Sequence, residues 1–409
     1  MKNILTLLFI LLIIPLTVFS AGDEADLLKK ARAIHDRALT VDTHTDTPLM
    51  FRSGSFDIGK RNDPRKRGGK VDFPRMKEGG LDSVFFAVFV GQGELTPEGR
   101  EKAKSNALNL FSLIKKAVNT YPDLAELALG SEDAPLIEKK GKRAIYIGME
   151  NGYPVGKEIS LVKEFYDLGA RYITLCHTRN NDICDSSTDR KGKLHAGLSE
   201  FGKKVVSEMN RIGMIIDVSH ISDDSFYDVL KYSKAPVIAS HSCARAICDN
   251  PRNLDDKMLK LLAEKGGVVQ LCILSEYVKT PKPNPARDEA FQKLRAKYSN
   301  YSKLPEKEKA KVREEWYELS RKYPRELATV SEAVDHIDHI VKIAGIDHVG
   351  IGTDFDGGGA LKDCYDSSEL WRITYELVKR GYSEEDIKKI WGGNFFRVFR
   401  SIEAHSKKG

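Results

Sequence analysis

The sequence predicts an α/β fold, and within that class a (β/α)8 TIM-type barrel. Eight apolar, strand-like runs alternate with helical patterns, which implies right-handed crossovers and a parallel sheet. Eight such units suit a closed barrel better than an open doubly wound sheet, and no run is followed by the Gly-x-Gly-x-x-Gly turn of a dinucleotide fold. The predicted strands are Thr40–Asp46, Ser83–Val90, Ala144–Glu150, Arg171–His177, Met214–His220, Pro236–His241, Gly267–Leu274 and His348–Asp354.

Length and composition agree with one large barrel domain. The chain has 409 residues, of which 41% are hydrophobic and 30% charged, which is typical of a globular protein with an ample core. The net charge of +6 is small for this size, and charges of both signs are interleaved. Because no basic stripe with spaced aromatic residues is present, we expect no nucleic-acid partner.

The N-terminus has the pattern of a secretory signal peptide. Lys2 precedes an apolar run over 4–19, and small residues follow it. We therefore expect a signal peptide over 1–20, a single mature domain over 21–409, and export to the periplasm or the extracellular space. The run is short for a spanning helix and contains Pro15, so an uncleaved anchor is the alternative. Neither a cysteine at the junction nor an apolar C-terminal tail supports a lipid anchor.

The elements between the strands follow in order. A charged amphipathic helix over Glu24–Arg37 leads into the first strand, and a polar loop follows over Arg61–Gly69. Between the seventh and eighth strands we expect a charged helical insertion over about 279–325. It fits either a solvated hairpin outside the barrel or a lid, since βα loops lie on the catalytic face of such barrels. The other predicted helices include Arg100–Val118, Glu158–Leu168, Ser199–Ile212, Asp223–Lys231 and Asp255–Lys265.

The cysteines are too sparse for a fold built on disulfides. In an exported protein disulfides are permitted, but sequence leaves their connectivity open. No Cys-x-x-Cys pair is present, which argues against a structural zinc ribbon. The six are Cys176, Cys184, Cys243, Cys248, Cys272 and Cys364.

Six of the eight predicted strands end on a histidine, aspartate or glutamate. One such residue alone would be explained by helix or turn capping. Six together at the C-terminal ends of barrel strands, where side chains converge, indicate a metal-binding rim. The strand ends are His44-Thr45-Asp46, Met149-Glu150, Cys176-His177, Ser219-His220, Ser240-His241 and Thr353-Asp354.

The ligand types suit a pair of metal ions. His44 and Asp46 lie two apart on a strand and share a face. With His220, His241 and Glu150 they make more ligands than one tetrahedral zinc needs. They suit two zincs about 3.5–4 Å apart, bridged by Glu150 and sharing a hydroxide that is nucleophilic near neutral pH.

Two further residues of the rim are not needed as metal ligands, and we expect them to act in catalysis. Asp354 is the expected proton-handling carboxylate, and His177 the expected donor to the developing oxyanion. His336 and His339, three apart on a helix, could clamp a metal in principle. The apolar stripe of that helix places both on its polar flank, so we assign them no ligand role.

With these strand-end residues the chain resembles the membrane (renal or microsomal) dipeptidases, which are zinc peptidases related to the amidohydrolase barrels. The matching motifs run in order from about residue 40 to 400 and cover nearly all of the mature chain. They are Asp42-Thr43-His44-Thr45-Asp46-Thr47-Pro48, Gly148-Met149-Glu150-Asn151-Gly152, Asp217-Val218-Ser219-His220, Ser240-His241-Ser242, Pro251-Arg252-Asn253 and Gly350-Ile351-Gly352-Thr353-Asp354-Phe355-Asp356-Gly357.

The resemblance implies a role for each position. One zinc would be held by His44, Asp46 and Glu150, and the other by Glu150, His220 and His241. His177 would contact the substrate near the scissile carbonyl, Asp354 would be the acid/base, and Tyr277 would add a substrate contact. Arg252 would bind the free carboxylate of a dipeptide substrate. Without the resemblance, Arg252 would be interpreted as a surface arginine paired with Asp249, Asp255 or Asp256. A homodimer stays open.

Three interpretations follow. The first is a secreted zinc dipeptidase. The second is a lactonase or amide hydrolase on the same barrel, because fold and metals do not choose a substrate. The third is a non-catalytic barrel that keeps its metals. The presence of both Asp354 and His177 favours an enzyme, since a binding relic needs neither a proton shuttle nor an oxyanion donor.

Overall fold

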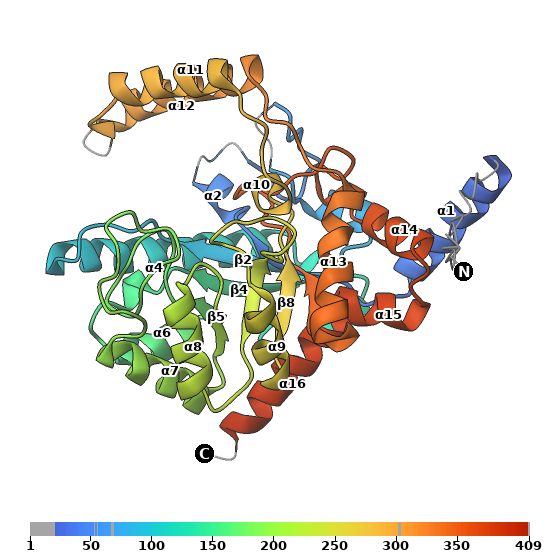
Figure 1. Ribbon diagram of the computed structural model, residues 1–409, viewed down its shortest axis with the longest axis horizontal. Coiled ribbons are helices and arrows are strands. Elements are labelled where there is room, and N and C mark those ends of the chain that lie inside the picture. Colours follow the sequence, from blue (N-terminus) through green and yellow to red (C-terminus); the bar gives the residue numbers. More distant parts are fainter. Residues whose placement is uncertain (1–20, 53, 55, 67–68, 302–303, 408–409) are drawn as a thin grey trace, which may run out of the picture.

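The computed structural model describes residues 21–409 except 53, 55, 67–68, 302–303 and 408–409, so the predicted signal peptide lies outside the described residues. Eight parallel strands form a nearly closed barrel in the order β1-β2-β4-β5-β6-β7-β8-β9, and a short ninth strand, β3, pairs with β4 (Figure 1). The strands are β1 (Val41–Thr45), β2 (Ser83–Phe89), β3 (Ala125–Leu127), β4 (Arg143–Glu150), β5 (Ala170–Thr174), β6 (Ile215–Asp217), β7 (Ile238–Ser242), β8 (Val268–Leu271) and β9 (Val349–Ile351).

Helices cover the outside of the sheet, as the strand–helix alternation predicts (Figure 1). The longest, α4, begins after an N-cap by Thr96 and buries one stripe that includes Leu110, Phe111 and Ile114. The α-helices are α1 (Ala21–His35), α2 (Pro48–Phe51), α3 (Phe73–Gly79), α4 (Pro97–Thr120), α5 (Asp133–Glu138), α6 (Ser160–Asp167), α7 (Glu200–Ile212), α8 (Asp223–Tyr232), α9 (Asp256–Glu264), α10 (Ser275–Val278), α11 (Pro285–Lys297), α12 (Glu306–Lys322), α13 (Val330–Ala344), α14 (Trp371–Lys379), α15 (Glu384–Lys388) and α16 (Asn394–Ser406). In the described residues no helix is long and apolar enough to cross a bilayer.

The first and last strands meet through residues at the ends of β1 and β9. The Thr353 amide donates to Asp42 Oδ1 at 2.8 Å, and the Asp354 amide donates to the His44 carbonyl at 3.0 Å. One step further along, the Asp46 amide donates to the Phe355 carbonyl at 2.8 Å. This seam places both predicted aspartates of the rim against the same short stretch of backbone.

Aromatic rings fill the barrel interior below the rim. Phe85 stacks on Tyr146 at 4.8 Å and on Tyr172 at 5.3 Å, measured between ring centroids, and Phe395 closes the stack from α16. A Cβ on Gly148 would lie 2.0 Å from Cζ of Tyr172, so only glycine leaves room for that ring. The Tyr172 hydroxyl therefore reaches up to the residues at the strand ends.

Several predicted boundaries are wrong. β5 ends at Thr174 and β6 at Asp217, so His177 and His220 lie in the loops that follow them. For β6 the reason is local: the Asp217 side chain accepts the Ser219 amide, and a side-chain bond of this kind replaces a ladder bond. The strand β3 was not predicted, because three residues carry no readable period.

The predicted position of His336 on a polar flank is also wrong. It is fully buried, not on a polar flank, and its two ring nitrogens contact the Ala244 amide and the Val278 carbonyl. A histidine whose ring nitrogens are both satisfied by backbone packs like an apolar residue. His339 is partly exposed and pairs with Asp256 at 2.7 Å. All six cysteines lie in the described residues and are buried free thiols.

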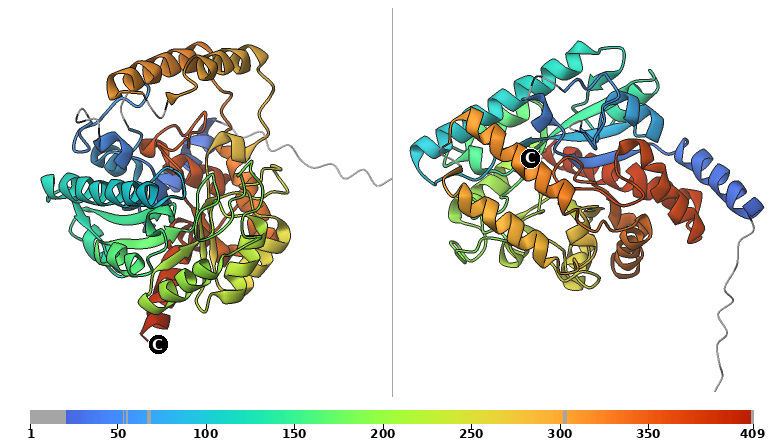
Figure 2. Two further views of the ribbon diagram at one scale, coloured as in Figure 1. Left: turned by 90° about the vertical axis from the view of Figure 1, so that its left-hand side faces the viewer. Right: turned by 90° about the horizontal axis from the view of Figure 1, so that it is seen from above.

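The helices α11 and α12 lie side by side and project from the barrel on the side of α10 (Figures 1 and 2). They fall within the range predicted as a charged helical insertion, and Phe291 of α11 packs against Trp316 of α12 at 5.8 Å between ring centroids. That this segment is an insertion, and that it acts as a lid, stay predictions.

His35 makes the stability of the protein depend on pH. Its Nε2 contacts the Gly79 carbonyl, and its Nδ1 contacts the hydroxyl of Thr374, which accepts from Trp391. Burial lowers the pKa of His35 to about 4, from 6.5. The unfolded chain therefore binds more protons between pH 6.5 and 4, and stability falls as the pH falls through that window.

We expect wild-type protein, stripped of metal, to lose about 3 kcal/mol from His35 between pH 7 and pH 4. Urea unfolding of wild type and His35→Gln at both pH values measures this loss. The variant should start less stable at pH 7 and lose about that much less on acidification. Parallel losses in the two proteins would show that His35 does not titrate in this window.

Candidate metal centre

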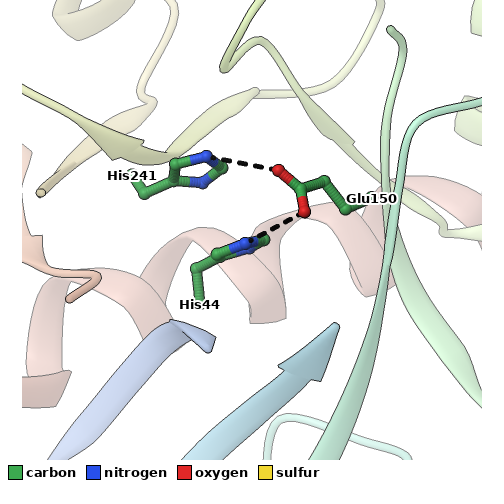
Figure 3. A group of neighbouring side chains, drawn as sticks. All are labelled: His44, Glu150 and His241. Atoms are coloured by element: carbon green, nitrogen blue, oxygen red, sulfur yellow. Dashed lines mark ion pairs between the residues drawn. The ribbon is translucent and has the colours of Figure 1, made fainter. Parts of the chain in front are cut away.

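The structure brings all seven rim residues predicted from sequence into one buried cluster. Three groups of side chains lie close enough to share an ion, and Glu150 at the end of β4 belongs to two of them. Figure 3 shows one of these groups, in which Glu150 lies between His44 and His241. The groups are His44 with Glu150 and His241, Glu150 with His177 and His220, and His44 with Asp46 and Asp354.

The two oxygens of Glu150 face different partners. Oε2 lies 3.4 Å from His44 Nε2, which in turn lies 3.8 Å from Asp46 Oδ2. Oε1 lies 3.1 Å from His220 Nε2 and 3.6 Å from His241 Nε2. One carboxylate thus stands between two sets of ligand-type atoms, which is the arrangement of a binuclear metal site.

Unsatisfied atoms in the cluster test whether a metal fits. His44 Nε2 and Asp46 Oδ1 are buried and have no hydrogen-bond partner among the described residues. His220 Nε2 and His241 Nε2 face each other at 2.8 Å. Because buried polar atoms are normally satisfied, unsatisfied ligand-type atoms among imidazoles and carboxylates fit a site for cations.

Neighbouring side chains fix the orientation of two of the buried imidazoles, those of His44 and His241. Tyr172 Oη contacts His44 Nδ1 at 2.7 Å, and Ser240 Oγ contacts His241 Nδ1 at 2.8 Å. The Ser240 hydroxyl donates to Asp217 at 2.6 Å, so it accepts from His241 and leaves Nε2 of that ring without a proton. This is the usual outer support of a metal-ligating histidine.

Two supporting aspartates were missed by the sequence reasoning. Asp217 accepts the amides of Ser219 and Ser240, and Asp42 accepts the amide and hydroxyl of Thr353. Both are fully buried. The signal was present in the motifs, since each aspartate stands inside an apolar strand two or three residues before a ligand-type histidine.

Burial and neighbouring charges shift the titration of the carboxyls in the metal-free chain. Burial and then the Asp46 carboxylate raise the pKa of Asp354 well above its usual value. Burial would also raise the pKa of Glu150, but the imidazoles of His44 and His177 outweigh it and hold that pKa well below its usual value. Two carboxyls of one cavity are thus driven toward opposite protonation states.

The loop that carries Asp354 is held in an uncommon backbone conformation. Asp354 and Asp356 have φ values of 62° and 66°, in the left-handed region. A Cβ on the next residue, Gly357, would lie 2.1 Å from Asp46 Oδ2 and 2.2 Å from Asp354 Oδ1. Only a glycine lets the chain pass directly against both carboxylates, so the strain and the glycine belong to the site.

Arg252 lies at the wall of the same cavity. Its side chain is only 4% exposed, Nη2 donates to the His241 carbonyl at 3.1 Å, and Nε has no partner among the described residues. The guanidinium lies 5.3 Å from the ring centroid of Tyr277. No described carboxylate pairs with it, so the alternative of a surface ion pair is wrong.

The cavity above the cluster measures about 360 Å³. His177 lies at its edge, 19% exposed, with its ring 4.8 Å from that of Phe89 between centroids. Sequence reasoning did not identify most of the other wall residues, because a residue in a loop looks the same in sequence whether or not it faces a cavity. The wall residues that it missed include Leu49, Phe89, Thr178, Thr188, Leu274 and Asp356.

Several known proteins are similar to this chain in sequence and in fold. A family model described as membrane dipeptidase (peptidase family M19) matches residues 28–409. The chain is 32% identical to dipeptidase tcpJ of Claviceps purpurea over 377 residues, which cover 90% of this chain and 78% of that protein. It is 30% identical to dipeptidase 3 of Homo sapiens over 396 residues, which cover 95% and 70%.

A crystal structure of the probable dipeptidase PvdM from Pseudomonas aeruginosa superposes with a TM-score of 0.79. That pair is 31% identical, and the match covers 93% of this chain and 99% of the other. A metallo peptidase from Rhodobacter sphaeroides shares the fold, with a TM-score of 0.71 at 22% identity over 89% of this chain and 99% of the other.

Proposed function

The chain belongs to the membrane dipeptidase family, peptidase family M19, and is a metallo-dipeptidase; from that premise we propose that it hydrolyses dipeptides with a free C-terminal carboxylate by means of two zinc ions. The observation that carries the proposal is Glu150, whose two oxygens face two separate ligand sets. His44, Asp46 and Glu150 would hold one zinc, and Glu150, His220 and His241 the other. Zinc ions held there would supply an activated water near neutral pH, the bridging hydroxide predicted from sequence.

Side chains of the protein would carry out proton transfer, stabilisation of the oxyanion and orientation of the substrate. Asp354, whose pKa is raised by burial, takes up and returns protons, and the leaving amine receives its proton from that carboxyl. His177, at the cavity edge and 3.5 Å from Glu150, donates to the oxygen of the scissile carbonyl as charge develops on it. Arg252 and Tyr277, which contact each other in the lining of the same cavity, orient the substrate.

The unpaired guanidinium of Arg252 favours a dipeptidase over the lactonase or amide hydrolase alternative. A buried arginine without a carboxylate partner is costly, and the terminal carboxylate of a dipeptide would supply that partner through two parallel N–H bonds. A neutral lactone would leave the charge unpaired.

We expect about two zinc ions per chain, loss of dipeptide hydrolysis on chelation, and recovery when zinc is added back. Metal analysis of the purified protein and assays with L-Ala-L-Ala and L-Ala-D-Ala measure all three. Full activity after exhaustive chelation would reject the metal assignment. Zinc binding without turnover of either dipeptide would reject the substrate class and leave the metal site standing.

We further propose that the chain is exported and that residues 1–20 are removed. The proposal is supported by the charged start, apolar run and small residues of that segment. N-terminal sequencing of the folded protein from the producing cell should begin near Ala21. A sequence beginning at Met1 or Lys2 would reassign the segment as an anchor.

A further inference from the structure

Leu274 stands between the catalytic cavity and a second cavity. The catalytic cavity, about 360 Å³, is lined by Leu274 together with Arg252 and Tyr277. The second cavity, about 660 Å³, lies at the base of the α11–α12 hairpin and is lined by Leu274 together with residues of α10 and α11. We call it the outer cavity. One side chain therefore contributes to the walls of both spaces.

Two neighbouring glycines line the two cavities beside Leu274. Gly357 lines the catalytic cavity and Gly358 lines the outer cavity, and neither has a side chain. A Cβ on Gly358 would lie 2.8 Å from Leu274 Cδ1, so the leucine packs directly on the glycine backbone. Among the described residues, Leu274 is the one that lines both cavities, so its isobutyl group is the side chain placed to separate them.

The backbone on either side of Leu274 is fixed. Leu274 forms a parallel bridge with Ala360, and its carbonyl accepts the Tyr277 amide at 2.8 Å. Because main-chain bonds hold the position, shortening the side chain should open the partition without moving α10. The expected change is therefore confined to the side chain of residue 274.

The position of Leu274 relates it to one end of the substrate. This step rests on the proposed function, in which Arg252 binds the terminal carboxylate. Arg252 lies over the ring of Tyr277, and Leu274 is one helical turn before Tyr277 on the same wall. The C-terminal residue of a bound dipeptide, held by its carboxylate, therefore lies against the Leu274 wall.

The chemistry of the outer cavity selects a class of side chain. Four basic and three acidic residues line it, so its charges nearly balance, and two of the ion pairs are Glu276 with Arg325 at 2.6 Å and Glu326 with Lys279 at 3.3 Å. Interleaved charges of both signs offer donors and acceptors without a strong net field. Such a surface suits a long, uncharged polar side chain better than a large apolar one.

We propose that Leu274 is a specificity-determining residue that limits the length of the C-terminal side chain, and that the outer cavity is a subsite for long polar side chains once this partition is opened. Leu274→Ala joins the two spaces, and Leu274→Phe thickens the partition.

The test compares kcat/KM for Gly-Ala and Gly-Gln in zinc-loaded wild type, Leu274→Ala and Leu274→Phe. We expect the Gly-Gln to Gly-Ala ratio to rise about 10-fold or more in Leu274→Ala and to fall in Leu274→Phe, because a pocket discriminates about 10- to 200-fold per methylene. The reversed pair, Ala-Gly and Gln-Gly, should show no such change, since it places the long side chain at the other end.

Leu49→Ala is the matched control, because Leu49 lines the catalytic cavity and not the outer one. Its ratio should stay near that of wild type. An unchanged ratio in folded Leu274→Ala, an equal rise in Leu49→Ala, or a rise confined to the reversed dipeptides would each overturn the proposal. If wild type turns over no dipeptide, the proposed function fails with it, whereas wild-type turnover with an unchanged ratio rejects the partition alone.

Discussion

Asp354→Asn is expected to keep both metal ions and to lower kcat by about 10²- to 10⁴-fold, the usual contribution of a general acid/base. Asparagine has nearly the same shape and tolerates the left-handed backbone at this position, but it cannot carry the proton. Steady-state kinetics on L-Ala-L-Ala, together with metal analysis of the same sample, measures both halves of the expectation.

Asp356→Asn provides the matched control. Asp356 lies two residues on, has the same backbone conformation and lines the same cavity. Its carboxylate is occupied by the Thr47 hydroxyl and the Lys70 amide, so it should affect stability more than kcat. If Asp354→Asn loses zinc, Asp354 is a ligand, and its assignment as the acid/base is wrong.

Arg252→Ala is expected to weaken kcat/KM for a dipeptide by about 2–4 kcal/mol, the range for truncating one partner of a buried charge pair. For the corresponding dipeptide amide the same substitution should change little, because the amide offers no carboxylate to pair. A fixed distance from Arg252 to the side-chain cluster around Glu150 would also predict a preference for dipeptides over longer chains. The measurement is kcat/KM for two substrates and two enzymes.

Arg252→Lys separates charge from geometry. Lysine restores the positive charge but not the two parallel N–H bonds, so it should recover part of the loss on the acid and none on the amide. Equal losses on acid and amide in Arg252→Ala would instead point to the bond from Arg252 to the His241 carbonyl and to a role in the fold.

The sequence allowed the barrel and the metal cluster to be predicted for one reason. Ligand-type residues at the ends of parallel strands converge whatever the loops do, so strand ends such as Glu150 and His241 could be placed without coordinates. The backbone conformation of residues beyond the strand ends could not be predicted, although their place in the cluster was. His220 reaches the cluster from a left-handed turn beyond its strand, and nothing in the sequence gives that conformation.

The burial of certain polar side chains was also not predicted from the sequence. His336, Asp42 and Asp217 look like surface residues by type, yet each is buried because backbone amides or carbonyls satisfy it. Whether a polar side chain finds such partners depends on contacts between distant segments. Periodicity along one segment carries no information about them.

The seam between β1 and β9 has a consequence for the timing of biosynthesis. Asp42 and Thr353, which are bonded across it, are 311 residues apart in the chain. At the usual rate of synthesis, on the order of ten residues per second, the first strand waits roughly half a minute for the last. Throughout that interval the backbone that presses on Asp46 does not exist. The site around Asp46 is therefore completed only after residues 353–357 have been made, near the end of synthesis.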